Sequence, residues 1–189
     1  MKKLLGILVL GLLLSVNVGY AENISIEESL EKAKEEEHGF ILVQRCGALF
    51  QYIFQNELTS LTESKSNDEK EKILKEFKKK NIYFVSFSIF YVSGIGFYMQ
   101  DLDYDAEKAS KIMSTQINEW ISIYQKIAKK NLNNSGDFLI GGYIKKDLVY
   151  CKDAAKYLIE FTANDEKARK FYKELTGEDI DASIIQDNF

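Results

Sequence analysis

The stretch NIYFVSFSIFYVSGIGFYMQ, residues 81–100, contains no charged side chain over its whole length. Its length and composition permit three structures: a helix buried inside a protein, a helix that spans a membrane, and a β-hairpin that turns near Ser93 and Gly94. A helix that is buried on several sides has no reason to be amphipathic. We therefore expect residues 82–99 to form a central buried helix, around which the rest of the chain folds.

The charges beside this stretch argue against the membrane alternative. Three lysines at 78–80 precede it, and Asp101, Asp103 and Asp105 follow it. If a cleaved leader leaves the N-terminus outside the cell membrane, a span here holds the lysines outside and sends the aspartates into the cytoplasm. That orientation reverses the positive-inside bias. The β-hairpin stays open as an alternative, because β-branched and aromatic residues favour strands.

The N-terminus has the pattern of a secretory signal peptide. Lys2 and Lys3 are followed by an uncharged apolar run over residues 4–16, and small residues stand at Gly19 and Ala21. A basic head, a short apolar segment and small residues at the cleavage site are the features that the export machinery recognises. We expect a signal peptide that is cleaved near Ala21, and a periplasmic or secreted product.

The net charge of the mature chain excludes one class of partner. Because Lys2 and Lys3 lie in the leader, its removal leaves 23 basic residues against 29 acidic ones, a net charge of −6. Nucleic-acid-binding proteins normally have the opposite sign, clustered on one face. We therefore expect no nucleic-acid partner, and we take an envelope protein or an apolar small molecule as the partner classes.

The two cysteines of the chain, Cys46 and Cys151, are about 105 residues apart. The leader directs both into a compartment that permits disulfides. Redox-active pairs usually lie two residues apart, so this spacing favours a structural bridge, which the chain-entropy model credits with about 4.7 kcal/mol. Both cysteines fall on apolar helical stripes: Cys46 with Val43 and Phe50, and Cys151 with Leu148, Ala155, Leu158 and Phe161.

Helical periodicity continues on both sides of the central stretch. Apolar residues recur at three- and four-residue spacing in four further segments. These segments are 40–61, 106–128, 148–161 and 168–175. The sequence therefore predicts a signal peptide at 1–21, an all-α single-domain bundle of five to seven helices at 22–177, and an acidic tail at 178–189. The disulfide is expected between the second and the penultimate long helices.

Capping residues give the boundaries of these helices. Ser25 with Glu28, and Ser66 with Glu69, fit the capping box that begins a helix. Further boundaries are expected at a polar loop over 62–67, at a break over Asn131–Gly136, at Asn164 as an N-cap, and at Gly177 as a helix stop.

The segments around the cysteines are Arg45-Cys46-Gly47-Ala48-Leu49-Phe50 and Asp147-Leu148-Val149-Tyr150-Cys151. Together with the leader and the long middle helices, they resemble the small uncharacterised two-cysteine helical proteins that Gram-negative bacteria secrete. The resemblance spans most of the mature chain and is architectural. It implies a helical fold and an exported location, and it carries over no activity and no functional residues.

The single histidine, His38, removes several catalytic mechanisms. A Ser-His-Asp triad has no marked serine, and zinc or haem sites need more ligands than one histidine supplies. Glu35 and His38 have the Glu-x-x-His spacing of di-iron bundles, but such a site needs two copies of the motif. Asp101, Asp103 and Asp105 lack the glycine and glutamate of a calcium loop and fit a loop before a helix. We assign no catalytic, cofactor-binding or metal-binding residue.

Aromatic residues are abundant, with 12 Phe, 11 Tyr and one Trp. Tyrosine rings with polar tips can line a pocket or a partner surface, although packing in the core is the simpler interpretation. The candidates for an apolar binding surface are Tyr91, Phe97, Tyr98 and Trp120. We expect a non-enzymatic protein that binds a partner protein or an apolar ligand. A histidine-independent carboxylate hydrolase and a membrane-inserted envelope component are the alternatives.

Overall fold

The fold is all-α, as expected. The computed structural model describes residues 24–137 and 143–185, apart from the side chain of Ser135. These residues form seven α-helices and one short 3-10 helix, and they contain no strand. The elements are α2 (Ile26–Lys32), η1 (Glu35–Glu37), α3 (His38–Thr62), α4 (Asn67–Lys80), α5 (Ile82–Leu102), α6 (Ala106–Ser135), α7 (Ile144–Asn164) and α8 (Glu166–Thr176). The predicted signal peptide at 1–21 lies outside the described residues.

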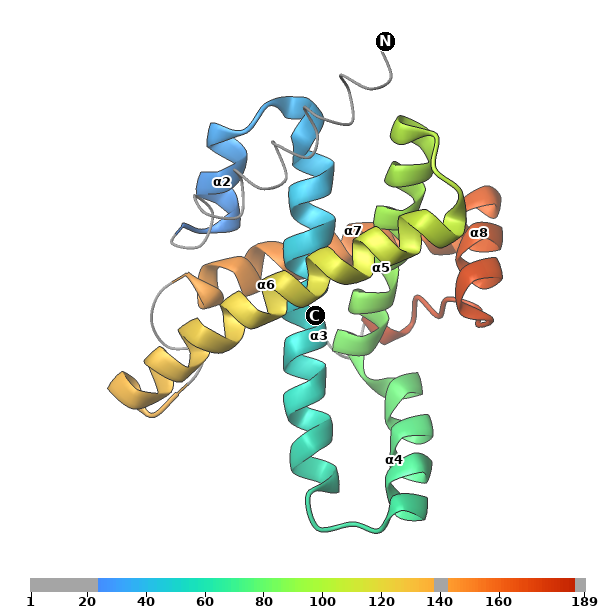
Figure 1. Cartoon of the computed structure of the whole chain (residues 1–189). Coiled ribbons are helices and arrows are strands. Elements are labelled where there is room, and N and C mark those ends of the chain that lie inside the picture. Colours follow the sequence, from blue (N-terminus) through green and yellow to red (C-terminus); the bar gives the residue numbers. More distant parts are fainter. Residues whose placement is uncertain (1–23, 138–142, 186–189) are drawn as a thin grey trace.

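The core lies where α3, α5 and α6 meet. In Figure 1, α3 and α5 run side by side and α6 crosses them. Glycines allow this close approach: a Cβ on Gly94 of α5 would lie 2.5 Å from the sulfur of Met113 on α6. A Cβ on Gly47 of α3 would lie 3.2 Å from Ile117 of α6. At these two crossings, glycine leaves room for an apolar side chain of α6, so the helices can pack closely.

The uncharged stretch forms the single helix α5, so the β-hairpin is excluded. Asn81 caps its start by accepting a hydrogen bond from the Phe84 amide, and Asp103, in the left-handed conformation, ends it. Within the described residues, α5 is the one helix long and apolar enough to cross a membrane, with a mean hydropathy of 1.5 over its most apolar window. Half of that window is buried in the fold. No residue of 82–99 is exposed, and the fully buried ones occur on all sides of the helix, so the expected central buried helix is confirmed.

The predicted disulfide is present. Cys46 on α3 and Cys151 on α7 are joined, with their Cα atoms 5.3 Å apart, and both side chains are fully buried. The bridge therefore connects the second α-helix to the penultimate one, as the sequence predicted. It is compatible with folding in an oxidising compartment.

Two helix boundaries differ from the prediction. The helix α6 does not break at Asn131 but continues to Ser135, and Gly136 then ends it with a left-handed backbone. Asparagine costs a helix only a few tenths of a kcal/mol, whereas glycine adopts the left-handed conformation freely. Asn164 is the last residue of α7, and the N-cap of α8 is the next residue, Asp165, whose carboxylate accepts from the Ala168 amide. Gly177 ends α8 as predicted.

The buried stripe of α7 is also rotated relative to the prediction. Its buried residues are Ile144, Asp147, Cys151, Ala155, Ile159 and Thr162. Leu158 is half-buried, and Phe161 is 48% exposed. The predicted stripe did not include Asp147, but this aspartate has buried partners on three other helices and therefore faces inward. The rotation leaves Leu158 and Phe161 beside a groove on the molecular surface.

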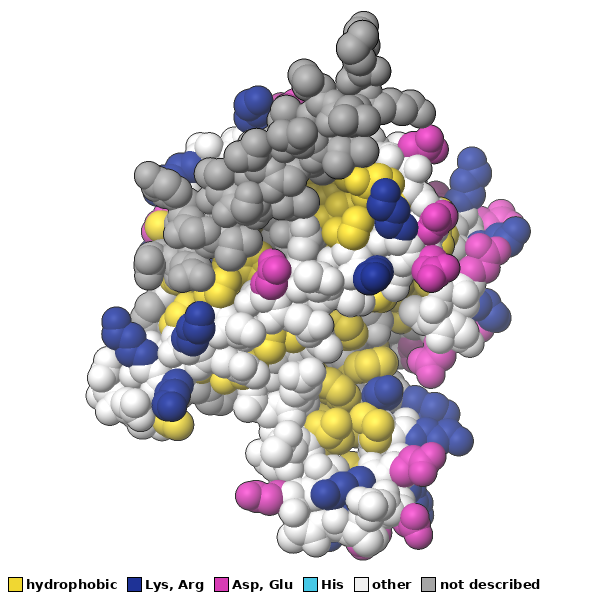
Figure 2. All heavy atoms as spheres, in the orientation of Figure 1, with side chains coloured by type: hydrophobic (Ala, Val, Ile, Leu, Met, Phe, Trp, Pro, Cys, Tyr) yellow, Lys and Arg dark blue, Asp and Glu magenta, His cyan; other side chains and the backbone are white. Residues whose placement is uncertain are grey.

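The helix α4 and the last turns of α3 form an antiparallel pair that projects from the body (Figure 1). We call residues 55–80 the arm. None of its residues in α3 or α4 is buried. The predicted capping box at Ser66 and Glu69 begins α4 in full, with hydrogen bonds in both directions. Figure 2 shows apolar side chains at the surface where the arm joins the body, with charged side chains around them.

The described part of the acidic tail packs against the body rather than extending from it. Ile185 is only 6% exposed, and Ile180, Ala182 and Ile184 are partly buried against the core. The aspartate Asp179 forms a salt bridge of 2.7 Å with Lys173 of α8. These contacts tie the residues after α8 back to the helical domain.

Candidate functional site

An apolar groove with a volume of about 730 Å³ lies between α3, α5, α7 and α8. This volume is in the range of sites that bind small molecules. The apolar residues that line this site are Leu42, Val43, Ile89, Phe90, Val92, Phe97, Ala154, Tyr157, Leu158, Phe161, Ala168 and Phe171. We call this site the groove.

Small residues on each of the four helices open the groove. They are Gly39 of α3, Gly96 of α5, Ala154 of α7 and Ala168 of α8. A Cβ on Gly96 would lie 3.5 Å from the ring of Phe171, so even a methyl group there would begin to fill the space between α5 and α8. Each of the four helices thus contributes a small residue to the lining of the groove.

Two aromatic rings form the outer wall of the groove. Tyr157 is 67% exposed and Phe161 is 48% exposed. They lie one turn apart on α7, with ring centroids 6.4 Å apart and planes inclined by only 14°. Large apolar side chains gathered at a surface commonly mark an interaction site. Here they extend the apolar surface of the groove outward into solvent.

Few polar groups line the groove, and most already have a structural role or lack charge. The carboxylate of Asp165 accepts a hydrogen bond of 2.8 Å from the Ala168 amide and caps α8. Lys167 is exposed and is the one cationic side chain among the lining residues. Ser93, Gln100 and Thr162 are neutral. With a single carboxylate, the lining holds no pair of acids of the kind that glycoside hydrolysis uses.

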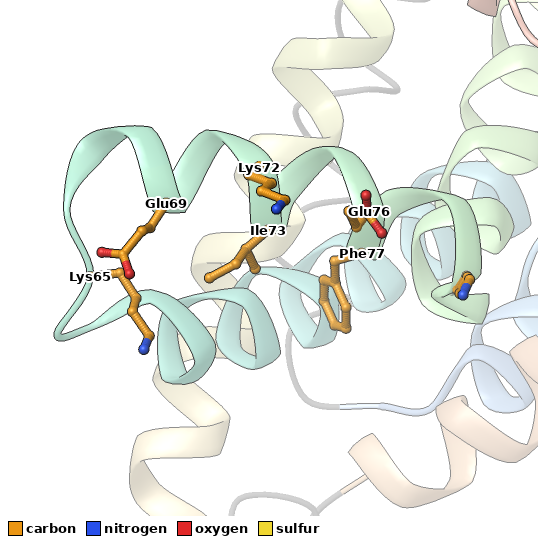
Figure 3. Close-up of a pocket in the computed structure, with 7 residues that line it drawn as sticks. Lys65, Glu69, Lys72, Ile73, Glu76 and Phe77 are labelled. Carbon is orange, nitrogen blue, oxygen red and sulfur yellow. The ribbon is translucent and has the colours of Figure 1, made fainter.

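A second hollow, in the arm, differs in chemistry. It measures about 710 Å³ and is lined by Lys65, Glu69, Lys72, Ile73, Glu76, Phe77 and Lys80. Figure 3 shows Ile73 and Phe77 pointing from α4 toward α3, with charged side chains on either side of them. Five of the seven lining residues are charged, so this hollow is a solvated surface that suits water and ions better than an apolar ligand.

The four aromatic residues singled out from the sequence lie in different places. Phe97 lines the groove. Tyr98 is only 1% exposed, and its hydroxyl donates a hydrogen bond to Gln116. Trp120 is 6% exposed in the core, and the hydroxyl of Tyr91 is hydrogen-bonded to Ser110 and Ser114 of α6. The structure therefore brings one of the four to the groove.

Sequence reasoning missed Tyr157 and Phe161 as groove residues. Phe161 was placed on the core stripe of α7, and Tyr157 was not singled out. The available signal was their spacing of four residues on one helix, which puts both rings on one face. Only the rotation of α7 shows that this face is turned outward.

A second group of interacting polar residues is a buried ion pair next to the disulfide. Arg45 and Asp147 are 1% and 0% exposed, and the guanidinium Nη2 lies 2.7 Å from the carboxylate Oδ2. The hydroxyl of Tyr124 also donates to Oδ2 at 2.7 Å, and the backbone amide of Ile26 donates to Oδ1 at 2.7 Å. Arg45 further donates to Ser29 Oγ at 2.6 Å. The pair thus connects α2, α3, α6 and α7.

Aromatic rings and burial set the electrostatics of this ion pair. The guanidinium carbon of Arg45 lies 4.6 Å from the ring centroid of Trp120 and 5.2 Å from that of Tyr143. Burial raises the pKa of the Asp147 carboxyl, although Arg45 and the hydrogen-bond donors act in the opposite direction. Burial and the neighbouring Asp147 raise the pKa of Tyr124 well above its ordinary value. The tyrosine therefore stays a neutral donor.

The ion pair and the disulfide form one structural unit. Arg45 directly precedes Cys46 on α3, and Asp147 lies one turn before Cys151 on α7. We call these four residues the clasp. None of them lines the groove, and all are fully buried, so the clasp fixes α3 to α7 and offers no reaction centre to solvent. The sequence signal that could have revealed the ion pair is a residue of opposite charge within one helical turn of each cysteine, Arg45 before Cys46 and Asp147 before Cys151.

The described residues contain no group of three or more His, Cys, Asp or Glu side chains able to hold a metal ion. Comparisons with known protein families, with curated proteins and with solved structures found no significant match. The function must therefore be inferred from the groove and the clasp.

Proposed function

We propose that this chain is an exported, non-enzymatic protein that binds an apolar ligand in the groove. The observation that carries the proposal is a surface site of about 730 Å³ with apolar side chains from four helices. Each methylene that leaves water for such a site contributes about 0.8 kcal/mol. A ligand that buries about ten methylenes therefore gains roughly 8 kcal/mol before the entropic cost of binding is subtracted.

The clasp supports this proposal because it holds two walls of the groove in place. Val43 of α3 lines the groove one turn before Cys46, and Ala154 of α7 lines it one turn after Cys151. A covalent link at this position limits how far the two walls can separate. A site that is formed before the ligand arrives loses less conformational entropy on binding.

The proposed location is the periplasm or the exterior of the cell. The leader pattern at residues 1–21 and the resemblance to secreted two-cysteine proteins support export. The disulfide between Cys46 and Cys151 supports an oxidising destination. Sequencing the N-terminus of the protein isolated from its own cells tests this: a start near Glu22 is expected, and an intact Met1 would contradict it.

Blocking the groove tests the binding function. The variant Ala154→Trp places a large ring in the groove, and Ala163→Trp, also on α7 but outside the groove, is the matched control. Binding is measured by the fluorescence of a neutral naphthylamine probe. We expect the wild type and Ala163→Trp to bind the probe and Ala154→Trp to lose most of the signal. Equal signals from all three proteins, or none from the wild type, would contradict the proposal.

A second candidate function is a membrane-associated component of the envelope. The observation in its favour is α5, whose length and apolarity suffice to cross a membrane. Against it, half of the apolar window is already buried within the fold. Carbonate extraction of the mature protein distinguishes the two: a supernatant fraction supports the groove-binding protein, and a pellet fraction supports the membrane component.

A further inference from the structure

The two charged side chains of the groove differ in whether they already have a hydrogen-bond partner. Asp165 and Lys167 are the two side chains with a formal charge in the lining. The carboxylate of Asp165 is already used, since it accepts from the Ala168 amide and caps α8. Lys167 is exposed and has no partner of this kind. Lys167 is therefore the charged group of the lining that is free to pair with an anionic ligand.

Lys167 lies next to the apolar part of the groove rather than apart from it. It is one turn before Phe171 on α8, and residues four apart share one face of a helix. Phe171 in turn faces Gly96 of α5 across the groove. A ligand with an apolar body and an anionic end can therefore contact the ring of Phe171 and the ammonium group of Lys167 at the same time.

The dimensions of the groove suit a flexible chain. Its lining on α5 runs from Ile89 to Gln100, which is about 16 Å along the helix axis. A single extended hydrocarbon chain can lie along this length in the groove of about 730 Å³.

We propose that the ligand is a single-chain fatty acid, with its hydrocarbon chain along α5 and α7 and its carboxylate beside Lys167. This inference rests on the proposed function of the groove. The aromatic wall of Tyr157 and Phe161 covers the chain on the solvent side. Lys167 is the one cationic side chain among the lining residues, so a monocarboxylate is preferred over a dicarboxylate.

A chain-length series tests the apolar part of the proposal. Octanoate, decanoate, dodecanoate and dodecanol are titrated into the disulfide-bonded mature protein by calorimetry, each below its micelle concentration. We expect the affinity of the carboxylates to rise about fourfold per methylene, because each buried methylene adds a constant increment. If none of the four compounds binds, both this proposal and the proposed function are wrong.

A pair of lysine variants tests the position of the carboxylate. Lys167→Met removes the charge in the groove, and Lys170→Met removes an exposed charge from the same helix outside the groove. We expect Lys167→Met to weaken dodecanoate about two- to fivefold, as for an exposed ion pair, and to leave dodecanol unchanged. Lys170→Met should change neither.

The remaining outcomes separate the proposals from each other. If dodecanol binds the wild type as tightly as dodecanoate does, or if Lys167→Met weakens both equally, the carboxylate assignment is overturned while the groove remains an apolar site. Sedimentation of the ligand-free protein tests whether a second copy of the chain occupies the groove instead. A dimer that Ala154→Trp dissociates would identify the groove as a self-association surface and would overturn the fatty-acid proposal.

Discussion

The two ends of α3 are stabilised in different ways. Near its start, Arg45 and Cys46 belong to the clasp and are fully buried. Beyond Phe54, no residue of α3 is buried, and the helix packs against α4, which has no buried residue either. One helix therefore extends from a cross-linked core into an arm that depends on local signals such as the Ser66 capping box. Sequence patterns predict local signals well, and the clasp depends on residues that are far apart.

The largest expected effect comes from removing the covalent part of the clasp. In the double variant Cys46→Ser and Cys151→Ser, we expect the free energy of unfolding to fall by about 4.7 kcal/mol, because the bridge closes a loop of roughly 100 residues. Urea denaturation followed by far-UV circular dichroism measures this. A midpoint equal to that of the wild type would show that the disulfide adds nothing to the core.

The next largest effect is expected from breaking the ion pair of the clasp. We expect Asp147→Ala to destabilise the protein by about 3–5 kcal/mol, because it leaves Arg45 buried without its counterion. The control is the double variant Arg45→Met and Asp147→Leu. An apolar pair of similar size should recover most of the loss, since replacement of a whole buried ion pair is often neutral. If the double variant is as unstable as the single one, unpaired charge is not the cause.

The groove, like the ion pair of the clasp, is formed by residues that are far apart in the sequence, and patterns within one segment do not predict it. The helix α5 and the all-α fold followed from charge and periodicity within single segments, and the disulfide followed from the leader and the spacing of the two cysteines. The groove is lined by residues of four helices, among them Gly39, Gly96, Ala154 and Ala168, and no one of these four is distinctive within its own segment. The burial of Asp147 similarly follows from partners on other helices. The predicted stripe of α7 left this aspartate out, and the buried face of the helix is rotated toward it.

A smaller effect is expected where the arm joins the body. The ring of Phe77 on α4 stacks on that of Phe54 on α3, with centroids 5.6 Å apart. We expect Phe77→Ala to weaken the arm by about 0.5–1.5 kcal/mol beyond the lost area, which is typical of an aromatic pair. Hydrogen exchange should show faster exchange for the α4 amides, while the amides around the clasp keep their protection. Equal loss of protection at both sites would mean that the arm and the core unfold as one unit.

The smallest effect concerns the capping box at the tip of the arm. Hydrogen bonds from the Ser66 amide and hydroxyl to the Glu69 carboxylate lower the pKa of Glu69. These bonds favour the charged carboxylate, so they contribute stability above the unfolded pKa and lose it as the pH falls through the folded pKa. Titration of the Glu69 carboxyl by nuclear magnetic resonance should give a midpoint below the ordinary value for glutamate.

The variant Ser66→Ala isolates the cause of this shift. It keeps the backbone amide but removes the hydroxyl, so the pKa of Glu69 should return partway toward its ordinary value. The start of α4 should also lose about 1 kcal/mol, which is typical of a removed N-cap. Because the arm has no buried residue in α3 or α4, the urea midpoint of the core should stay constant. A shift of that midpoint would show that the capping box contributes to the clasped core, and the two ends of α3 would then be coupled.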